Sequence, residues 1–228
     1  MKLPITREVA RPGAPPLRSS MGHLGTPTSE LSPFFVAIGA SGGEGLDDIR
    51  RLLSALPVSL HAVVLVVLHR PSDTVSRLRD VLSVTSNMPV VLAVDGERFR
   101  RGRCYIGEPD AHLTLAAKSR IRLVEGADHK HRNRSVDLLF NSIAAHAGAH
   151  GIGIVLSGAL DDGARGLAAI HHAGGATMVL TRAGLAGAGM PRNAAQYDGP
   201  VDLLGSAVSI AQDVVRRVQS ENLNEVNM

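Results

Sequence analysis

The chain has no tryptophan, and its aromatic residues are four phenylalanines and two tyrosines among 228 residues. Few rings are therefore available on which single-stranded bases could stack. The net charge of +3 is also small for a protein that binds a phosphate backbone. We therefore expect no nucleic-acid partner.

Cysteine and long apolar runs are scarce as well. Cys104 is the single cysteine, which excludes an internal disulfide and any site built from several thiolates. The longest apolar run, 62–68, is far shorter than the roughly 20 residues that cross a bilayer. No apolar segment precedes a small-residue cleavage site near the amino terminus. We expect a cytoplasmic protein without membrane insertion.

Composition divides the chain into three parts. Residues 1–32 are rich in proline, serine, threonine and glycine and show no hydrophobic period, so we expect a disordered arm. Residues 33–220 are predicted to form one domain, and 221–228 a disordered tail.

Short apolar runs alternate with helical patterns inside this domain. The runs typical of buried strands are 34–39, 62–68, 90–94, 151–156 and 176–180, and the helical patterns lie near 45–56, 73–82, 135–147, 164–173 and 210–218. Ser135 is the expected N-cap of its helix, with Asp137 near the positive end. Shorter strands between 95 and 126 suggest an antiparallel excursion at a sheet edge. The fold class predicted is α/β: a doubly wound, mostly parallel sheet with helices on both faces.

Polar residues that directly follow buried strands are the first candidates for a site, because ligands of such sheets bind beyond the carboxyl ends of the strands. Ser41 follows the first run, His69 ends the second, and Asp161 and Asp162 follow the run at 151–156. A hydroxyl, an imidazole and a carboxylate are the minimum set for serine acyl transfer.

Ser41 lies in a G-x-S-x-G pattern, Gly39 to Gly43, which is typical of a nucleophile elbow. This pattern predicts a strained serine backbone, flanking glycines that approach each other, and a Gly42 amide directed at an oxyanion. The alternatives are an ordinary turn or a phosphate-binding loop at Ser41, a solvated His69, and a helix N-cap at Asp161 or Asp162.

Six segments from about Phe34 to Val218 occur in the order known from the catalytic domain of the CheB family, the protein-glutamate methylesterases of bacterial chemotaxis, which this chain resembles. They are Ile38-Gly39-Ala40-Ser41, His69-x-Pro71, Tyr105-Ile106 with Pro109-Asp110-x-His112-Leu113, Ser135-Val136-Asp137-x-Leu139-Phe140, Ser157-Gly158 with Asp162-Gly163-Ala164-x-Gly166-Leu167, and Gly189-Met190-Pro191.

The resemblance implies that Ser41 is the nucleophile, His69 the general base and Asp162 the orienting carboxylate, with Asp161 as second choice. Gly42 and Ala159 are the expected donors of oxyanion-binding amides. The implied substrate is the γ-methyl ester of glutamate on a chemoreceptor, with deamidation of receptor glutamine in many members. No cofactor or metal is expected.

The resemblance also bears on partners. Regulated members carry a receiver domain, and about thirty residues at the amino terminus are too few to fold into one. We therefore expect an unregulated domain or one controlled by a separate partner. A methyltransferase is a further candidate partner. Departures from the family pattern at Glu44, Ala159 and Leu160 leave two alternatives: a catalytically silent receptor-binding module, and a small-molecule esterase.

The sequence contains two basic runs, one at Arg98, Arg100, Arg101 and Arg103 and one at 129–134. A solvated face is the ordinary interpretation of such runs. The functional hypothesis is that they flank the site and attract acidic receptor helices.

Overall fold

The computed structural model describes residues 33–70, 76–125, 134–159, 161–182, 185–186, 188–197 and 199–226. The arm predicted over 1–32 lies outside the described residues, as do Leu160 and the start of the helix predicted at 73–82.

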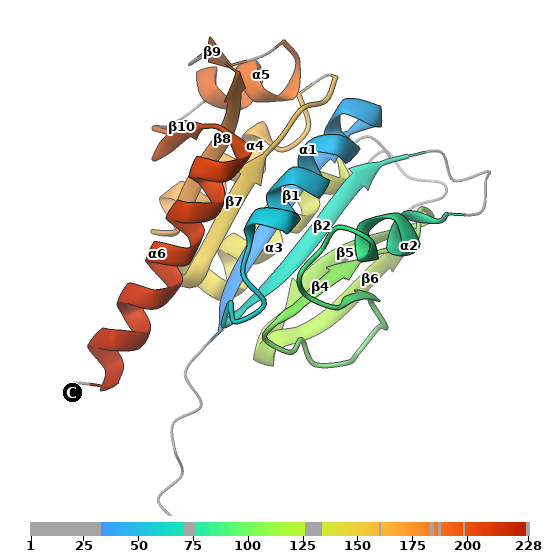
Figure 1. Cartoon of the computed structure of the whole chain (residues 1–228), viewed down its shortest axis with the longest axis vertical. Helices are drawn as coiled ribbons and strands as arrows, with labels where there is room; N and C mark the ends of the chain where they lie inside the picture. Colours follow the sequence, from blue (N-terminus) through green and yellow to red (C-terminus); the bar gives the residue numbers. More distant parts are fainter. Residues whose placement is uncertain are drawn as a thin grey trace, which may run out of the picture. The chain divides into compact units, whose positions relative to one another are not determined.

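Within the described residues, parallel strands form a central sheet in the order β10-β8-β7-β1-β2-β4-β3 (Figure 1). Their bounds are β1 (Phe34–Ser41), β2 (Ala62–His69), β3 (Val90–Leu92), β4 (Arg103–Ile106), β7 (Gly151–Val155), β8 (Ala176–Arg182) and β10 (Leu203–Gly205). The short β9 (Leu185–Ala186) pairs with β8 in the antiparallel direction. The strands at the centre of the sheet are buried on both faces, which explains their unbroken apolar sequences.

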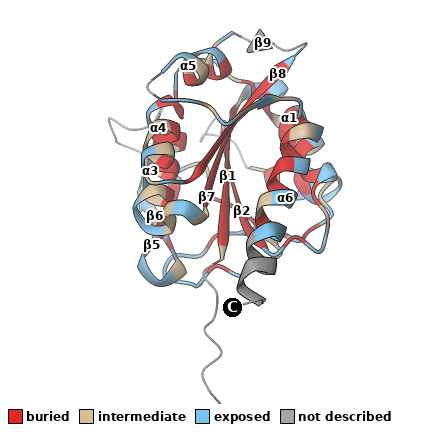
Figure 2. Ribbon diagram, turned by 90° about the vertical axis from the view of Figure 1, so that its left-hand side faces the viewer, coloured by how far each residue is buried: buried red, intermediate tan, exposed pale blue. Residues whose placement is uncertain are grey.

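Helices cover both faces of the sheet (Figure 2). One face carries α1 (Gly42–Ala55), α2 (Leu78–Ser83) and α6 (Ala207–Val226), and the other carries α3 (Ser135–Ala147), α4 (Ala164–His172) and α5 (Met190–Gln196). Alternate residues of β1 enter the two cores: Ile38 packs with the first set of helices, and Ala37 with the second. The doubly wound α/β prediction is confirmed.

The antiparallel excursion is a separate two-stranded sheet, β5 (Ala111–Ala116) with β6 (Arg120–Glu125), joined by the 3₁₀ turn η1 (Ala117–Ser119). It packs against α3 and places Leu113, Leu115 and Ile121 in the second core. The hairpin therefore covers part of one face, while β4, from the same stretch of sequence, joins the main sheet in parallel.

Several elements differ from the sequence prediction; β9 and α5, for example, were not predicted. β10 was not predicted because its three residues are too short to show a period. α6 continues to Val226, into the residues predicted to be a disordered tail, because an established helix extends at little cost even without an apolar face. A second 3₁₀ turn, η2 (Gly148–His150), precedes β7.

Cys104 is buried, and this burial raises its pKa to about 12. None of the described helices is long and apolar enough to span a bilayer.

Candidate active site

Ser41 and His69 end two neighbouring strands of the sheet. They are register partners across the parallel pair β1 and β2, and such strands lie about 4.8 Å apart. Register partners project to the same face, and Val67, two residues before His69, belongs to the core on the α3 side. The topology thus brings the hydroxyl and the imidazole together at the carboxyl edge on that face.

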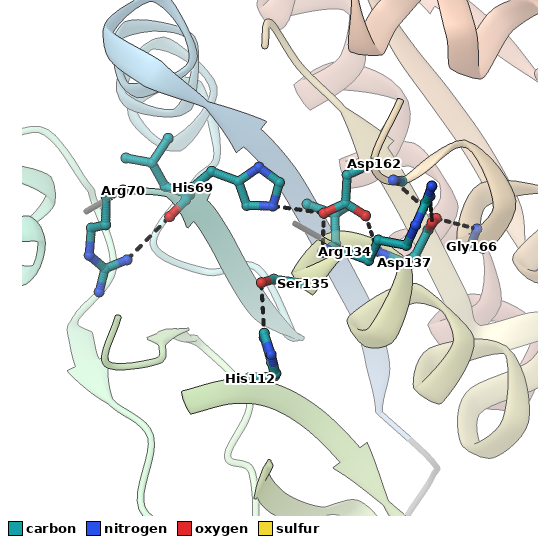
Figure 3. A network of polar contacts seen from close by, with 11 residues as sticks. His69, Arg70, His112, Arg134, Ser135, Asp137, Asp162 and Gly166 are labelled. Carbon is teal, nitrogen blue, oxygen red and sulfur yellow. Dashed lines mark hydrogen bonds and ion pairs between the residues drawn. The ribbon is translucent and has the colours of Figure 1, made fainter. Parts of the chain in front are cut away.

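Asp162 reaches the same place from the loop between β7 and α4. Its Oδ2 atom lies 2.7 Å from Nε2 of His69, and its side chain is 1% exposed (Figure 3). The carboxylate also accepts the N–H groups of Val136 and Asp137, each at 2.9 Å, in the first turn of α3. Unpaired N–H groups and the helix dipole favour a negative charge there. Main-chain donors therefore fix the carboxylate against the imidazole.

Asp137 accepts main-chain N–H groups at the start of α4, as Asp162 does at the start of α3. Its Oδ1 atom accepts the N–H groups of Gly163 at 3.0 Å and Gly166 at 2.8 Å, at the start of α4. Arg134 pairs with Oδ2 at 3.2 Å. Burial raises the pKa of Asp137, and the negative charge of Asp162 adds to that effect. The starts of α3 and α4 are thus tied together by two carboxylates, each accepting from the other's helix.

Ser135 does not cap α3, contrary to the sequence prediction. It is the first helical residue, after Arg134, and its hydroxyl lies 2.9 Å from Nδ1 of His112 on β5. The capping acceptor is Asp162, which no local pattern could reveal because it is distant in sequence. Ser135 instead joins the hairpin to the helix beside the candidate site.

The two adjacent aspartates have different environments. Asp161 is 54% exposed and faces Arg134 at 3.5 Å, whereas Asp162 is buried against His69. Of the two carboxylates weighed from the sequence, Asp162 is the one in contact with the imidazole.

The glycine pattern around Ser41 has a different geometry from the one predicted. Ser41 itself is extended, with φ −144°, so the predicted strain at the serine is wrong. The left-handed residue is Gly42, with φ +71°. Gly39 and Gly43 do not approach each other: a Cβ at Gly39 would lie 2.2 Å from Val136, and one at Gly43 would meet nothing within 4 Å. Gly39 is therefore required by the packing of α3 on β1.

A cavity of about 630 Å³ opens beside Ser41. Gly42 and Ala159, the two expected oxyanion donors, both line it. One wall is held close to the serine: Ser41 donates its N–H to Ser157 O at 3.0 Å, and Met190 donates to Gly158 O at 2.9 Å. The cavity is large enough for a side-chain ester next to the hydroxyl.

The sequence interpretation missed several parts of this site. Arg182, at the end of β8, lines the cavity and pairs with buried Asp48 of α1 at 3.2 Å. Gly189, with φ +71°, lies so near Gly158 that a Cβ would come within 2.2 Å of its carbonyl oxygen. The Gly189-Met190-Pro191 segment was noted in the sequence but given no role, and Arg182 gave no local signal.

The first basic run does not flank the site. Arg103 begins β4 and pairs in register with Val63, near the start of β2, so it lies at the amino end of the sheet. Gly102 donates to Ala62 O at the same end. In the second run, residues 129–133 lie outside the described residues, and Arg134 contacts Asp137 as described above.

Comparison with known proteins identifies the family of the chain. The family model described as CheB methylesterase matches residues 36–214. The chain belongs to the CheB methylesterase family. Its structure is similar to the crystal structure of the Thermotoga maritima CheB methylesterase catalytic domain, with a TM-score of 0.72 and 26% identity, covering 82% of this chain and 99% of that one.

Two relatives of this family are each named protein-glutamate methylesterase/protein-glutamine glutaminase. The one from Salmonella typhimurium is 34% identical over 188 residues, which is 81% of this chain and 53% of that protein. The one from Yersinia pestis is 35% identical over the same length, with the same coverage. The chain thus spans about half the length of the curated relatives it matches.

Proposed function

We propose that this chain is a serine hydrolase that removes the methyl group from glutamate γ-methyl esters of a chemoreceptor or similar signalling protein. The observation that carries the proposal is the contact between His69 and Asp162, at the strand ends next to Ser41. The names of the relatives point to the same ester chemistry. A cytoplasmic location and a separate regulatory partner stay predictions.

In this proposal His69 is the general base. Its Nε2 atom faces Asp162, so Nδ1 is the ring nitrogen left to take the Ser41 proton. The Ser41 oxygen then attacks the ester carbonyl, and the N–H groups of Gly42 and Ala159 bind the oxyanion. Asp162 stabilises the imidazolium that forms and holds the ring in place.

Acylation is completed, and deacylation follows, by proton transfers through His69. The imidazolium returns its proton to the leaving methoxide, methanol departs, and an acyl-enzyme remains on Ser41. Water, deprotonated by His69, attacks the acyl carbonyl; the bond to Ser41 Oγ then breaks, the imidazolium returns the proton to this oxygen, and the glutamate side chain is released. An amine is a poorer leaving group than methoxide, so we expect deamidation of receptor glutamine to be slower than ester hydrolysis.

The test is mass spectrometry of methylated receptor peptides after incubation with the protein. We expect loss of one methyl group per ester with the wild type and no loss with Ser41→Ala. Ser54→Ala, which alters an exposed serine on α1, is the matched control and should retain activity.

Two results would overturn the proposal. Unchanged peptides that still bind the protein would indicate a catalytically silent receptor-binding module. Intact methylated peptides together with Ser41-dependent hydrolysis of a simple aryl ester would indicate a small-molecule esterase.

A further inference from the structure

A second concave surface lies at the β3–β4 edge of the sheet and extends toward its amino end. It is a cavity of about 400 Å³ lined by three arginines, Arg98, Arg100 and Arg103, which we call the arginine pocket. Glu97 and the apolar residues Val91 and Leu92 are also in its wall. Arg103 is level with Val63, which lies six residues before His69 along β2, a span of about 20 Å. The pocket is therefore distinct from the candidate active site.

Positive charge is concentrated around this pocket. The segments 95–103 and 117–122 contain the basic residues Arg98, Arg100, Arg101, Arg103, Lys118, Arg120 and Arg122, and the acidic residues Asp95 and Glu97. Outside these two segments, acidic residues outnumber Lys and Arg in the chain. The excess of positive charge of the whole protein thus comes from this surface.

The two segments are held side by side by main-chain hydrogen bonds. Phe99 donates to Ser119 O at 2.9 Å, and Ile121 donates to Glu97 O at 2.7 Å. Between these bonds Arg98 and Arg120 stand opposite each other in an antiparallel bridge. Directly opposed like charges destabilise a pair of strands, so the fold keeps these two cations together at a cost.

The three arginines of the pocket have no carboxylate partner in the part of the chain that the structure describes. Asp95, the nearest acidic residue in sequence besides Glu97, accepts the N–H of Leu123 at 2.8 Å. Three guanidinium groups around one cavity are thus available to an anion from outside, and their planar forks match carboxylates in bidentate geometry.

We propose that the arginine pocket and the basic surface around it bind an acidic segment of a protein partner. Two observations favour a protein segment over a small anion. The basic residues extend beyond the pocket onto β6, farther than one small anion reaches, and Leu92, 37% exposed in the wall, offers an apolar contact. Nucleic acid is disfavoured because Tyr105, the aromatic residue of the wall, is 4% exposed and presents little ring surface for stacking.

The test uses a short fluorescently labelled peptide of glutamates with one central leucine, and its binding is followed by fluorescence anisotropy. We expect saturable binding that weakens as salt is added, and no binding of the same peptide with glutamine in place of glutamate. The double variant Arg98→Glu/Arg100→Glu should lower the affinity by roughly tenfold or more.

The control is Arg216→Glu, which reverses an exposed arginine on α6, on the other face of the sheet, and should leave the affinity unchanged. Arg98→Ala/Arg100→Ala, with a thermal unfolding scan of each protein, separates loss of the surface from loss of the fold. Equal affinity for the glutamate and glutamine peptides, or equal affinity in the double variants, would overturn the proposal. So would binding of pyrophosphate without binding of the peptide. None of these measurements depends on ester hydrolysis, so this proposal is tested separately from the proposed function.

Discussion

The two ends of the central sheet differ in whether their charged side chains have partners within the fold. At the carboxyl end, Asp162 and Asp137 are buried, and each accepts two main-chain N–H groups in addition to its charged or titratable neighbour. At the amino end, Arg98 faces Arg120 and has no carboxylate partner among the described residues.

Under the two proposals above, this difference separates the catalytic end of the sheet from the end that binds a partner. A group that must hold one geometry during a reaction needs partners supplied by the fold, because reorganising them would raise the barrier. A group that attracts another molecule is more useful when its charge is left uncompensated.

Asp162→Asn should have the largest effect. The amide has one acceptor oxygen for the N–H groups of Val136 and Asp137, and it cannot stabilise an imidazolium at His69. We expect kcat for ester hydrolysis to fall on the order of 10³- to 10⁴-fold. The control is Asp161→Asn, whose carboxylate is exposed and should change kcat little. Equal losses in both variants would contradict the assignment of Asp162.

Gly158→Ala tests the packing around the serine. A Cβ there would lie 2.4 Å from the Met190 sulfur and 2.8 Å from Ser41 Cβ, so the cavity wall must shift. We expect a loss of about 1–3 kcal/mol in the free energy of unfolding, measured in urea, and a fall in activity. Gly43→Ala meets nothing within 4 Å and should be neutral or slightly stabilising. Equal free energies of unfolding in Gly158→Ala and Gly43→Ala would contradict the tight packing inferred at Gly158.

The raised pKa of Asp137 predicts a pH dependence of stability. Because the folded state binds this proton more tightly than the unfolded state, stability falls as pH rises above the ordinary carboxyl pKa of 3.8. Asp137→Asn cannot titrate. The free energy of unfolding of the variant, relative to wild type, should therefore increase with pH from about 4 upward until Asp137 is fully ionised.

Urea denaturation at several pH values measures this difference. Asp47→Asn, at an exposed position on α1, should show no such trend. A difference between Asp137→Asn and wild type that stays constant with pH would show that the environment of Asp137 does not penalise its charge.

Arg98→Ala should have the smallest effect on stability and, unlike Gly158→Ala, should raise the free energy of unfolding. Removing one of two opposed cations should stabilise the fold by up to about 0.5 kcal/mol. Arg217→Ala, which removes an ion pair with Asp213 on α6, should instead be neutral or slightly destabilising. A clear loss of stability in Arg98→Ala would mean that the fold does compensate this charge.

Much of the fold was predictable from the sequence because buried parallel strands have a strong local signature. The runs that became β1, β2 and β7 were identified nearly to their ends. The strand ends in turn identified Ser41, His69 and the Asp161-Asp162 pair, since topology alone brings the carboxyl ends of parallel strands together.

What could not be predicted depended on contacts between distant residues. The choice between Asp161 and Asp162 depends on which carboxylate reaches the first turn of α3, and the sequence does not encode that orientation locally. For the same reason Ser135 was taken for the cap, and Arg98 was expected beside the active site. In each case the partner lies more than twenty residues away along the chain.

The anchoring of Asp162 has a consequence for sequence variation. Its two donors are main-chain N–H groups, so the side chains at positions 136 and 137 can change without removing either hydrogen bond. Proline is the one amino acid that lacks this group. The two hydrogen bonds to Asp162 therefore depend on the backbone of α3, and proline at position 136 or 137 would remove one of them.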